Sequence, residues 1–273
     1  MAAAPDNGSR GDGVADALIR ITSPDLPIYR VFPLWRFQAA LGNRQLVLAS
    51  PHLWEDPNEE IGSAAAVNSR RGGRVIINQS LAPVFAQCWS AAPESDTLLR
   101  AYSRVVKDPE FSRNTCPRDE GVRVKTTPRK LLQALRAGTL GHWHGKWFVG
   151  AVEYTTQNGL LQKIADDIGR FGLRAHEAPV NRAHLHLRKH ETFSHESEVR
   201  ALYVQTEPQF EGPLMRVQIE PSAVFEEVSF DPRLETFERL ERESVIRSLG
   251  FTGEIREPPF YRRVLPDIWV EEP

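Results

Sequence analysis

Carboxylate and cationic side chains gather around one predicted strand within residues 189–203. On a pleated strand that begins near residue 198, Glu198 and Arg200 point to the same face. If the extended chain reaches back to Glu196, the Cα atoms of Glu196 and Glu198 lie roughly 6.5–7 Å apart. Such closeness raises the proton affinity of one carboxylate, so one can hold a proton while the other stays charged. The pair is suited to general acid–base chemistry.

A second interpretation of the same pattern requires no catalysis. Glu-x-Glu-x-Arg is also typical of a solvated strand face with local ion pairs. Glu196 and Glu198 then merely pair with Lys189 and Arg200. The choice depends on whether other reactive groups converge on the same place.

Arg30 is another candidate for chemistry. It lies near the end of a predicted strand, residues 28–32, just before Pro33. The guanidinium group forms a rigid fork that matches a carboxylate or a phosphate. Arg30 is therefore either a structural clamp for a neighbouring carbonyl or carboxylate, or a grip for a phosphate.

Two His-x-His pairs, His142/His144 and His184/His186, lie in predicted strands. On a strand both rings of a pair point to one face, which supplies half of a zinc or iron site. Spacing fixes no third ligand, and apolar residues are interleaved with both pairs as in any half-buried strand. We therefore expect no metal, and metal-dependent hydrolysis is only a third hypothesis.

Three common enzyme signatures are missing from the sequence. It contains no G-x-G-x-x-G fingerprint and no phosphate-binding GK[ST] loop, which argues against a Rossmann dehydrogenase and a P-loop enzyme. No G-x-S-x-G elbow precedes a predicted helix, which argues against a Ser–His–Glu hydrolase.

The composition is that of an ordinary folded protein. The chain has 273 residues and a formal net charge of −2, so its global charge indicates neither a nucleic-acid nor a membrane partner. Cys88 and Cys116 lack metal-like spacing, and free thiols are typical of a reducing compartment. Because there is no run of membrane-spanning length and no signal-peptide pattern, we expect a cytoplasmic protein.

Strands and helices are interspersed along the chain without a repeat. Strands are predicted at 28–32, 46–49, 75–78, 84–90, 121–125, 183–190, 198–205, 215–219 and 224–230, with a hairpin around Gly145-Lys146. Periodicity and capping residues predict helices at 33–42, 96–106, 128–138, 160–171 and 232–250. These elements predict an α+β fold, a single domain with curved, mainly antiparallel sheets and peripheral helices.

The N-terminal residues are mostly Ala, Gly, Asp and Ser, and order is expected to begin near Leu26. Residues 1–25 are therefore predicted to be a disordered tail, and residues 26–273 a single domain. Tyr102 is expected in the core. The last helix is expected to bury its apolar residues, Leu234, Phe237, Leu240 and Val245.

A series of short motifs resembles the bacterial DUF2971 family. The motifs are Ile28-Tyr29-Arg30, Ser50-Pro51 through Glu55-Asp56-Pro57, Cys88-Trp89-Ser90 followed by Asp96, Leu99 and Tyr102-Ser103, Gly121-Val122-Arg123-Val124, and Lys189 with Phe193, Glu196, Glu198 and Arg200. The likeness extends from about Leu26 to the region of Phe260. It implies one DUF2971-like domain over residues 26–273.

The order arginine, serine, Glu-x-Glu resembles that of the ADP-ribosyltransferases, which cleave NAD and transfer ADP-ribose to an acceptor. The resemblance implies an ADP-ribosyltransferase-like fold in which Arg30 grips the NAD phosphates, Ser90 seats the nicotinamide ribose and Glu198 hydrogen-bonds the ribose 2′-hydroxyl. Glu196 would orient or deprotonate the acceptor. The rings of Tyr29, Trp89 and Tyr102 would stack on NAD. Each of these residues is also a candidate core residue.

Two hypotheses about function remain. The first is an NAD-consuming ADP-ribosyltransferase-like enzyme, with a protein or nucleic-acid acceptor and a toxin or defence context. A fixed carboxylate would stabilise the positive charge that develops on the sugar as nicotinamide leaves. The second is a non-catalytic nucleotide- or protein-binding module on the same scaffold. The enzyme requires Arg30, Ser90 and Glu198 in one cleft, whereas the module allows them to lie apart or Glu198 to be locked in an ion pair.

Overall fold

The computed structural model describes residues 13–60, 66–68, 74–76, 83–141, 143–172, 176–207, 209 and 212–257. Its strands are β1 (Leu18–Ile19), β2 (Ile28–Pro33), β3 (Gln45–Ala49), β4 (Ala66–Asn68), β5 (Arg74–Ile76), β6 (Val84–Ser90), β7 (Gly121–Thr126), β8 (Gly145–Ala151), β9 (Glu153–Thr155), β10 (Arg188–His190), β11 (Glu198–Gln205), β12 (Leu214–Gln218), β13 (Glu227–Phe230) and β14 (Glu254–Ile255). Its helices are α1 (Leu34–Gly42), α3 (Asp96–Tyr102), α4 (Pro128–Ala137), α5 (Gln157–Phe171), α6 (Pro179–Leu185), α7 (Pro221–Val224) and α8 (Thr236–Ser248), with 3₁₀ turns η1 (Ala15–Ala17), η2 (Pro51–Leu53), η3 (Pro57–Glu60) and η5 (Glu191–Glu196).

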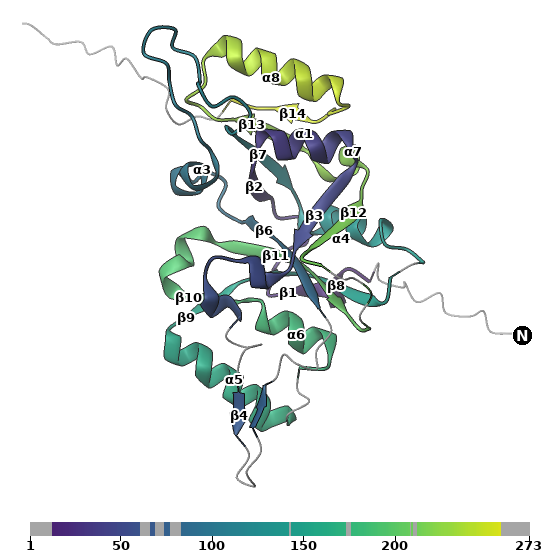
Figure 1. Cartoon of the computed structure of the whole chain (residues 1–273). Coiled ribbons are helices and arrows are strands. Elements are labelled where there is room, and N and C mark those ends of the chain that lie inside the picture. The colour runs from purple at the N-terminus through teal and green to yellow at the C-terminus, as the bar shows by residue number, and fades with distance from the viewer. Residues whose placement is uncertain are drawn as a thin grey trace, which may run out of the picture.

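One large sheet runs through the described part of the chain (Figure 1). Its strand order is β1-β8-β11-β6-β2-β7-β13-β14, and β3 joins β6 while β12 joins β3. The pairs β1–β8 and β13–β14 are parallel, and the other pairs of this sheet are antiparallel. Helices lie around the sheet, with α1 and α8 at one end and α5 and α6 at the other. The predicted α+β fold with a mainly antiparallel sheet is confirmed.

β11 is the central strand of one half of the sheet and is buried along its whole length. It lies between β6 and β8, and apolar clusters cover both of its faces. Tyr203 belongs to the larger cluster, which includes Phe85, whereas Leu202 belongs to the smaller one. Because apolar residues anchor the strand on both faces, its polar residues are carried into the interior with it.

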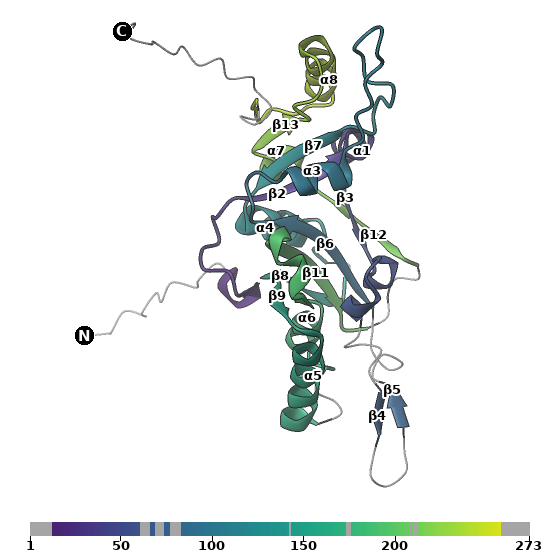
Figure 2. The same cartoon turned by 90° about the vertical axis from the view of Figure 1, so that its left-hand side faces the viewer.

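The sheet divides where β2 meets β6. These strands share only the register pair Tyr29↔Ser90. By contrast, β2 pairs with β7 over its full length, and β6 pairs with β11 over its full length. The two halves therefore diverge from this junction (Figure 2).

Two predicted elements have a different structure around the histidine-rich region. The predicted strand 183–190 is instead the helix α6 followed by the short strand β10, because Pro179 occupies the first helical turn. Gly145-Lys146 does not turn a hairpin but begins β8. A Cβ atom at Gly145 would lie 2.4 Å from the ring of Tyr203, so this glycine allows close packing rather than a turn.

Ordered structure begins before residue 26. β1 pairs with β8, and Val14 and Ala17 are buried in the core, so the residues from Val14 to Ile19 belong to the fold rather than to a tail. The part of the predicted tail at 1–12 lies outside the described residues. Among the described residues, no helix combines the length and apolar character needed to cross a bilayer.

α8 packs against the protein with two polar residues, Glu238 and Arg242, and with Ile246. Arg242 Nε donates to Glu120 Oε1 at 2.8 Å, and Glu238 Oε1 accepts from the backbone N–H of Asn114 at 2.8 Å. Leu234, which precedes the helix, is buried as expected. The prediction is wrong for Phe237, Leu240 and Val245, which are all exposed, because these buried polar contacts fix the rotation of the helix.

Candidate functional site

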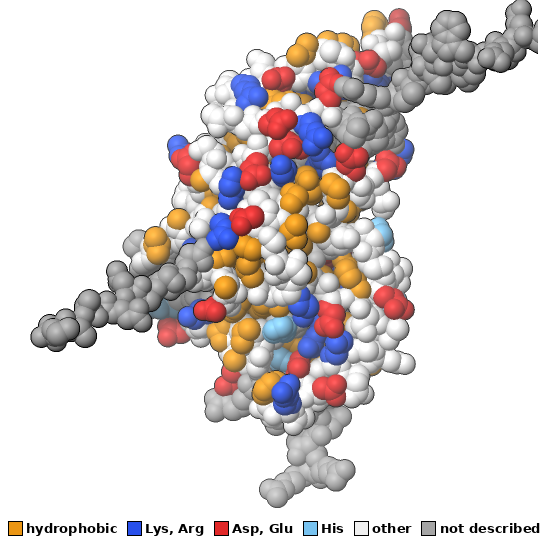
Figure 3. Space-filling view, turned by 180° about the vertical axis from the view of Figure 1, so that it is seen from behind, with side chains coloured by type: hydrophobic (Ala, Val, Ile, Leu, Met, Phe, Trp, Pro, Cys, Tyr) orange, Lys and Arg blue, Asp and Glu red, His pale blue; other side chains and the backbone are white. Residues whose placement is uncertain are grey.

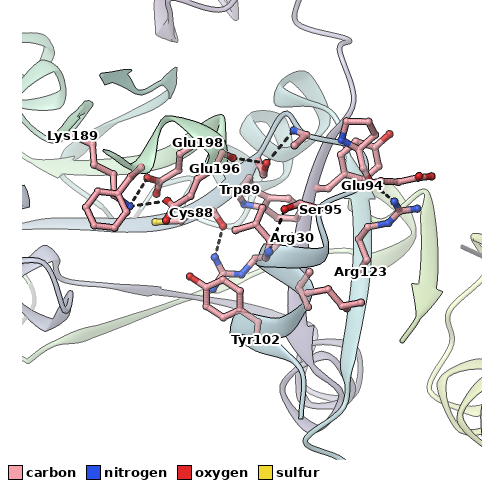
Figure 4. Close-up of a pocket in the computed structure, with 18 of the residues that line it drawn as sticks. Arg30, Cys88, Trp89, Glu94, Ser95, Tyr102, Arg123, Lys189, Glu196 and Glu198 are labelled. Carbon is pink, nitrogen blue, oxygen red and sulfur yellow. Dashed lines mark hydrogen bonds and ion pairs between the residues drawn. The ribbon is translucent and has the colours of Figure 1, made fainter. Parts of the chain in front are cut away.

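A cavity of about 830 Å³ lies between the diverging halves of the sheet. In Figure 4 it extends from Lys189 at one end, past Arg30, to Arg123 at the other. Its volume is within the range of small-molecule and cofactor pockets. It is lined by all the predicted site residues, namely Tyr29, Arg30, Trp89, Ser90, Tyr102, Glu196 and Glu198. Segments that are far apart in the sequence thus share one cavity.

Glu198 and Arg200 lie on one face of β11, as predicted, and form a buried two-point ion pair. Arg200 Nε donates to Glu198 Oε1 at 2.9 Å, and Nη2 donates to Oε2 at 2.7 Å. Burial alone would raise the pKa of Glu198, but the charge and hydrogen bonds of Arg200, with Lys189, outweigh burial and lower that pKa to about 2. Glu198 is therefore a fixed negative charge.

Lys189 links this pair to two further carboxylates. Its Nζ lies 2.7 Å from Glu196 Oε2, 3.4 Å from Glu198 Oε2 and 3.2 Å from Glu59 Oε1. Glu59 also accepts a hydrogen bond from Arg200 Nη2. We call these side chains, Glu59, Lys189, Glu196, Glu198 and Arg200, the charged floor of the cavity.

Glu59 is a site residue that sequence reasoning missed. It belongs to the Pro-punctuated loop at 50–60, whose composition is typical of turns and helix caps. No local signal marks it, because its partner Arg200 is 141 residues further along the chain. Burial raises the pKa of Glu59, although Arg200 and Lys189 oppose that shift.

Aromatic rings cover both cations of the charged floor. The ring centroid of Trp54 lies 4.2 Å from the guanidinium carbon of Arg200, and that of Phe193 lies 4.6 Å from Lys189 Nζ. Both rings line the cavity. They stabilise the cations by cation–π interaction and exclude water, which strengthens the ion pairs beneath them.

The extended chain of β11 does not reach back to Glu196, so the two glutamates do not share a strand. Glu196 ends the 3₁₀ turn η5, and Ser197 then adopts the left-handed conformation, with φ 44° and ψ 50°. This conformation is rare for residues other than glycine and is concentrated at functional sites. The kink turns Glu196 away from the strand, yet Lys189 still bridges the two carboxylates.

Ser90 is in the cavity, but its hydroxyl already has protein partners. Ser90 Oγ donates to the backbone carbonyl of Glu196 at 2.6 Å and accepts from the backbone N–H of Ala92 at 3.0 Å. The hydroxyl thereby joins the end of β6 to the turn that carries Glu196.

Arg30 extends from β2 toward β6, where its Nη1 donates to the backbone carbonyl of Cys88. Its Nε is buried and has no hydrogen-bond partner among the described residues. Burial lowers the pKa of Arg30, although an arginine stays charged in proteins. A buried cationic donor without a partner, on a side chain that lines a cavity, is a candidate contact for an anionic ligand.

The predicted aromatic residues have different environments. Trp89 is a core residue at the cavity wall, since it is 2% exposed and its Nε1 donates to Gln87 Oε1 at 3.1 Å. Tyr102 is not in the core, because α3 ends there and leaves the side chain 53% exposed. The ring of Tyr29 stacks against the guanidinium of Arg123 at 5.0 Å. Of the three predicted rings, those of Tyr29 and Tyr102 are therefore the two that a ligand could contact.

The histidine pairs do not form a metal site within the described residues. His184 lies in α6 and His186 directly after it, so their rings do not share a face as they would on a strand. His142 lies outside the described residues, and His144 is exposed. No group of three or more potential ligands occurs in the described part of the chain. On the face opposite to Figure 1, histidines lie among Lys, Arg and acidic side chains (Figure 3).

Comparison with known proteins gives a distant structural similarity. No family model matches the chain, so nothing supports the resemblance to DUF2971 beyond the motifs themselves, and no curated protein matches it. Solved structures of DarT from Thermus sp. 2.9 are similar. The complex with NAD+ is 11% identical, covers 87% of this chain and 98% of its own, and has a TM-score of 0.37.

Two further DarT structures from Thermus sp. 2.9 are similar to the same degree. The complex with ADP-ribosylated ssDNA is 13% identical, covers 88% of this chain and 97% of its own, and has a TM-score of 0.34. The complex with carba-NAD+ is 13% identical, covers 86% and 96%, and has a TM-score of 0.33. Similarity this distant does not define a function, which rests on the geometry of the cavity.

Proposed function

We propose that the cavity binds NAD and that the protein is an ADP-ribosyltransferase-like enzyme, which transfers ADP-ribose to a protein or nucleic-acid acceptor. The observation that carries this proposal is the position of Arg30. Its buried Nε lacks a partner among the described residues, and Arg30 lines the same cavity as Glu196 and Glu198. A phosphate would satisfy this donor, and the carboxylates lie where a sugar joined to that phosphate can reach.

The distribution of charge along the cavity fits a dinucleotide. The charged floor contains more carboxylates than cations, which suits the cationic nicotinamide ring and its ribose. Arg30 lies in the middle, where the pyrophosphate would pass. Tyr29 and Tyr102 offer stacking surfaces for the adenine ring.

The proposed reaction exchanges one bond of NAD for another. The bond between C1′ of the ribose and the nicotinamide nitrogen breaks, and nicotinamide leaves with the electron pair. Positive charge develops on the sugar, and the fixed carboxylates stabilise that charge as it appears. A nucleophile of the acceptor then bonds to C1′ and loses its proton to a carboxylate or to water.

A non-catalytic nucleotide-binding module is the second candidate. The observation that favours it is the pairing of Glu198 with Arg200 and Lys189, which occupies both carboxylate oxygens. Such a network also stabilises a pocket that only binds. The two candidates differ in whether bound NAD is cleaved.

Two measurements test the proposal, namely NAD affinity by calorimetry and nicotinamide release by chromatography with protein and nucleic-acid acceptors. We expect the wild type to bind NAD and release nicotinamide. Arg30→Lys keeps the charge but loses the fork, and should weaken NAD binding about tenfold or more. Arg100→Lys, an exposed arginine outside the cavity lining, is the matched control and should bind like the wild type.

The outcomes separate the candidates. Binding without release with any acceptor would support the module. If the wild type neither binds NAD nor releases nicotinamide, the ADP-ribosyltransferase proposal is wrong. Equal NAD affinity in Arg30→Lys and the wild type would show that Arg30 does not contact the phosphates.

A further inference from the structure

Glu196 and Glu198 line the same cavity but differ in what their oxygens can do. Glu198 accepts from Arg200 on both oxygens, and Oε2 also faces Lys189 Nζ at 3.4 Å. Cys88 also contributes to lowering the pKa of this carboxylate. A carboxylate has about four acceptor positions, so little capacity is left at Glu198 for a ligand hydroxyl.

Glu196 has one oxygen engaged and one available. Oε2 accepts from Lys189 Nζ at 2.7 Å, and Oε1 has no partner among the described residues. The side chain of Glu196 is 22% exposed, whereas that of Glu198 is 5% exposed. Of the two carboxylates, Glu196 is the one that can accept a hydrogen bond or face a positive charge without breaking an existing contact.

The backbone around Glu196 is fixed from two sides. Ser90 Oγ holds the carbonyl of Glu196, and the backbone N–H of Ala91 donates to the carbonyl of Ser197 at 2.8 Å. The N–H of Glu198 donates to the hydroxyl of Tyr154 at 2.7 Å. These bonds hold the left-handed Ser197 in place, so Glu196 is oriented before a ligand arrives.

We propose that Glu196, rather than Glu198, is the carboxylate that contacts the reacting sugar. Glu198 and Ser90 are positioning residues, since Glu198 holds Arg200 and Lys189 while Ser90 holds the backbone of Glu196. Lys189 ties down one oxygen of Glu196 and leaves the other directed to the ligand. This assignment rests on the proposed function, because it concerns the sugar of NAD.

The test measures kcat and KM for nicotinamide release together with Tm for variants of the full chain. Glu196→Gln should lower kcat by about 100-fold or more, with KM near the wild-type value and Tm within about 2 °C. Glu198→Gln leaves Arg200 undercompensated, so Tm should fall by roughly 10 °C. Glu198→Asp retains the charge and should recover most of both Tm and kcat.

A serine pair supplies the matched control for positioning. Ser90→Ala should lower kcat about tenfold at unchanged KM, because Glu196 loses its fixed backbone. Ser248→Ala removes a serine hydroxyl that likewise donates to a backbone carbonyl, that of Val245 at 2.7 Å, but lies outside the cavity lining, and should leave kcat unchanged.

Each outcome bears on a different claim. An active wild type whose Glu196→Gln variant keeps the wild-type kcat overturns the inference, whether or not Glu198→Gln folds. So does a Glu198→Gln variant that keeps the wild-type Tm and loses kcat. If the wild type itself releases no nicotinamide, the proposed function is wrong. This outcome is distinct from failure of the inference, because it is seen in the wild type before any variant is compared.

Discussion

Arg200 and Glu198, two residues apart on one strand, meet through parallel hydrogen bonds of 2.9 and 2.7 Å in the interior of the protein. Arg200 also donates to the backbone carbonyl of His186 at 2.7 Å and to the carboxylate of Glu59. One fully buried guanidinium therefore joins β11, the end of α6 and the loop at 50–60. The shape of the cavity floor depends on this single side chain.

Arg200→Met should destabilise the protein strongly. The methionine is apolar and of similar length, so it leaves Glu198 and Glu59 buried with Lys189 as their remaining charged partner. Removing one partner of a buried ion pair costs about 3–5 kcal/mol of unfolding free energy. Urea denaturation of the variant and the wild type would measure this loss. Arg100→Met breaks the exposed pair with Asp96 and should change that energy by less than about 1 kcal/mol. Equal effects of the two substitutions would contradict the role of Arg200 in joining β11, α6 and the loop at 50–60.

Ser197→Gly should stabilise the protein by up to about 1 kcal/mol. Ser197 has φ 44°, and a side chain is strained in that conformation whereas glycine is not. Ser194→Gly is the matched control, because Ser194 lies within the preceding 3₁₀ turn, where glycine should cost about 0.5–1 kcal/mol. Chemical denaturation of both variants measures the difference. Destabilisation by Ser197→Gly would mean that the serine makes contacts that outweigh its strain.

The free energy of unfolding should fall as pH drops from 6.5 to 4.5. Burial, with the charges of Arg182 and Arg200, lowers the pKa of His186 to about 3. Below pH 6.5 the unfolded chain therefore takes up a proton that folded His186 does not, and by linkage this should cost about 2 kcal/mol across the window. Glu198, with its pKa lowered to about 2, makes a stabilising contribution that is lost only below about pH 4.5, so it does not affect this window.

Urea denaturation at several pH values checks this slope. His186→Gln should make it shallower, and lowered pKa values of His176 and His184 should leave part of it. The exposed His52, replaced by Gln, serves as the control and should leave the slope unchanged. An identical slope in His186→Gln and the wild type would show that His186 is not the titrating group.

Cys88 should resist alkylation in the folded protein. Burial and the negative charge of Glu198 raise the pKa of its thiol, and the thiolate is the reactive form. At pH 8, iodoacetamide should modify Cys116 about tenfold or more faster than Cys88, as followed by mass spectrometry. In denaturant the two rates should become equal. Rapid modification of native Cys88 would show that its thiol is not held in the unreactive protonated form.

Local patterns predicted much of the fold. The alternation along β11 placed Glu198 and Arg200 on one face, and Thr127, Pro128 and Gly138 marked α4. Failures occurred where tertiary contacts decide. The rotation of α8 about its axis depends on contacts with Glu120 and Asn114, which are more than 100 residues away in the sequence. The periodicity of the helix sequence carries no information about such distant contacts.

The candidate site was predicted in composition rather than in arrangement. Short motifs indicated Arg30, Ser90, Glu196 and Glu198, and all four line one cavity. Their partners were not predictable, because Glu59 reaches Arg200 through folding of a loop with an ordinary turn composition. Strand periodicity could not foresee a left-handed serine between the two glutamates.

The single register pair between β2 and β6 separates two properties of the pocket. Glu198 and Arg200 belong to β11, whereas Tyr29 and Arg30 belong to β2, on the other side of that junction. Substitutions that tilt β2 would widen or narrow the opening of the cavity for a ligand and leave the charged floor unchanged. The size of ligand that the cavity admits and the charge of its floor can therefore be changed independently.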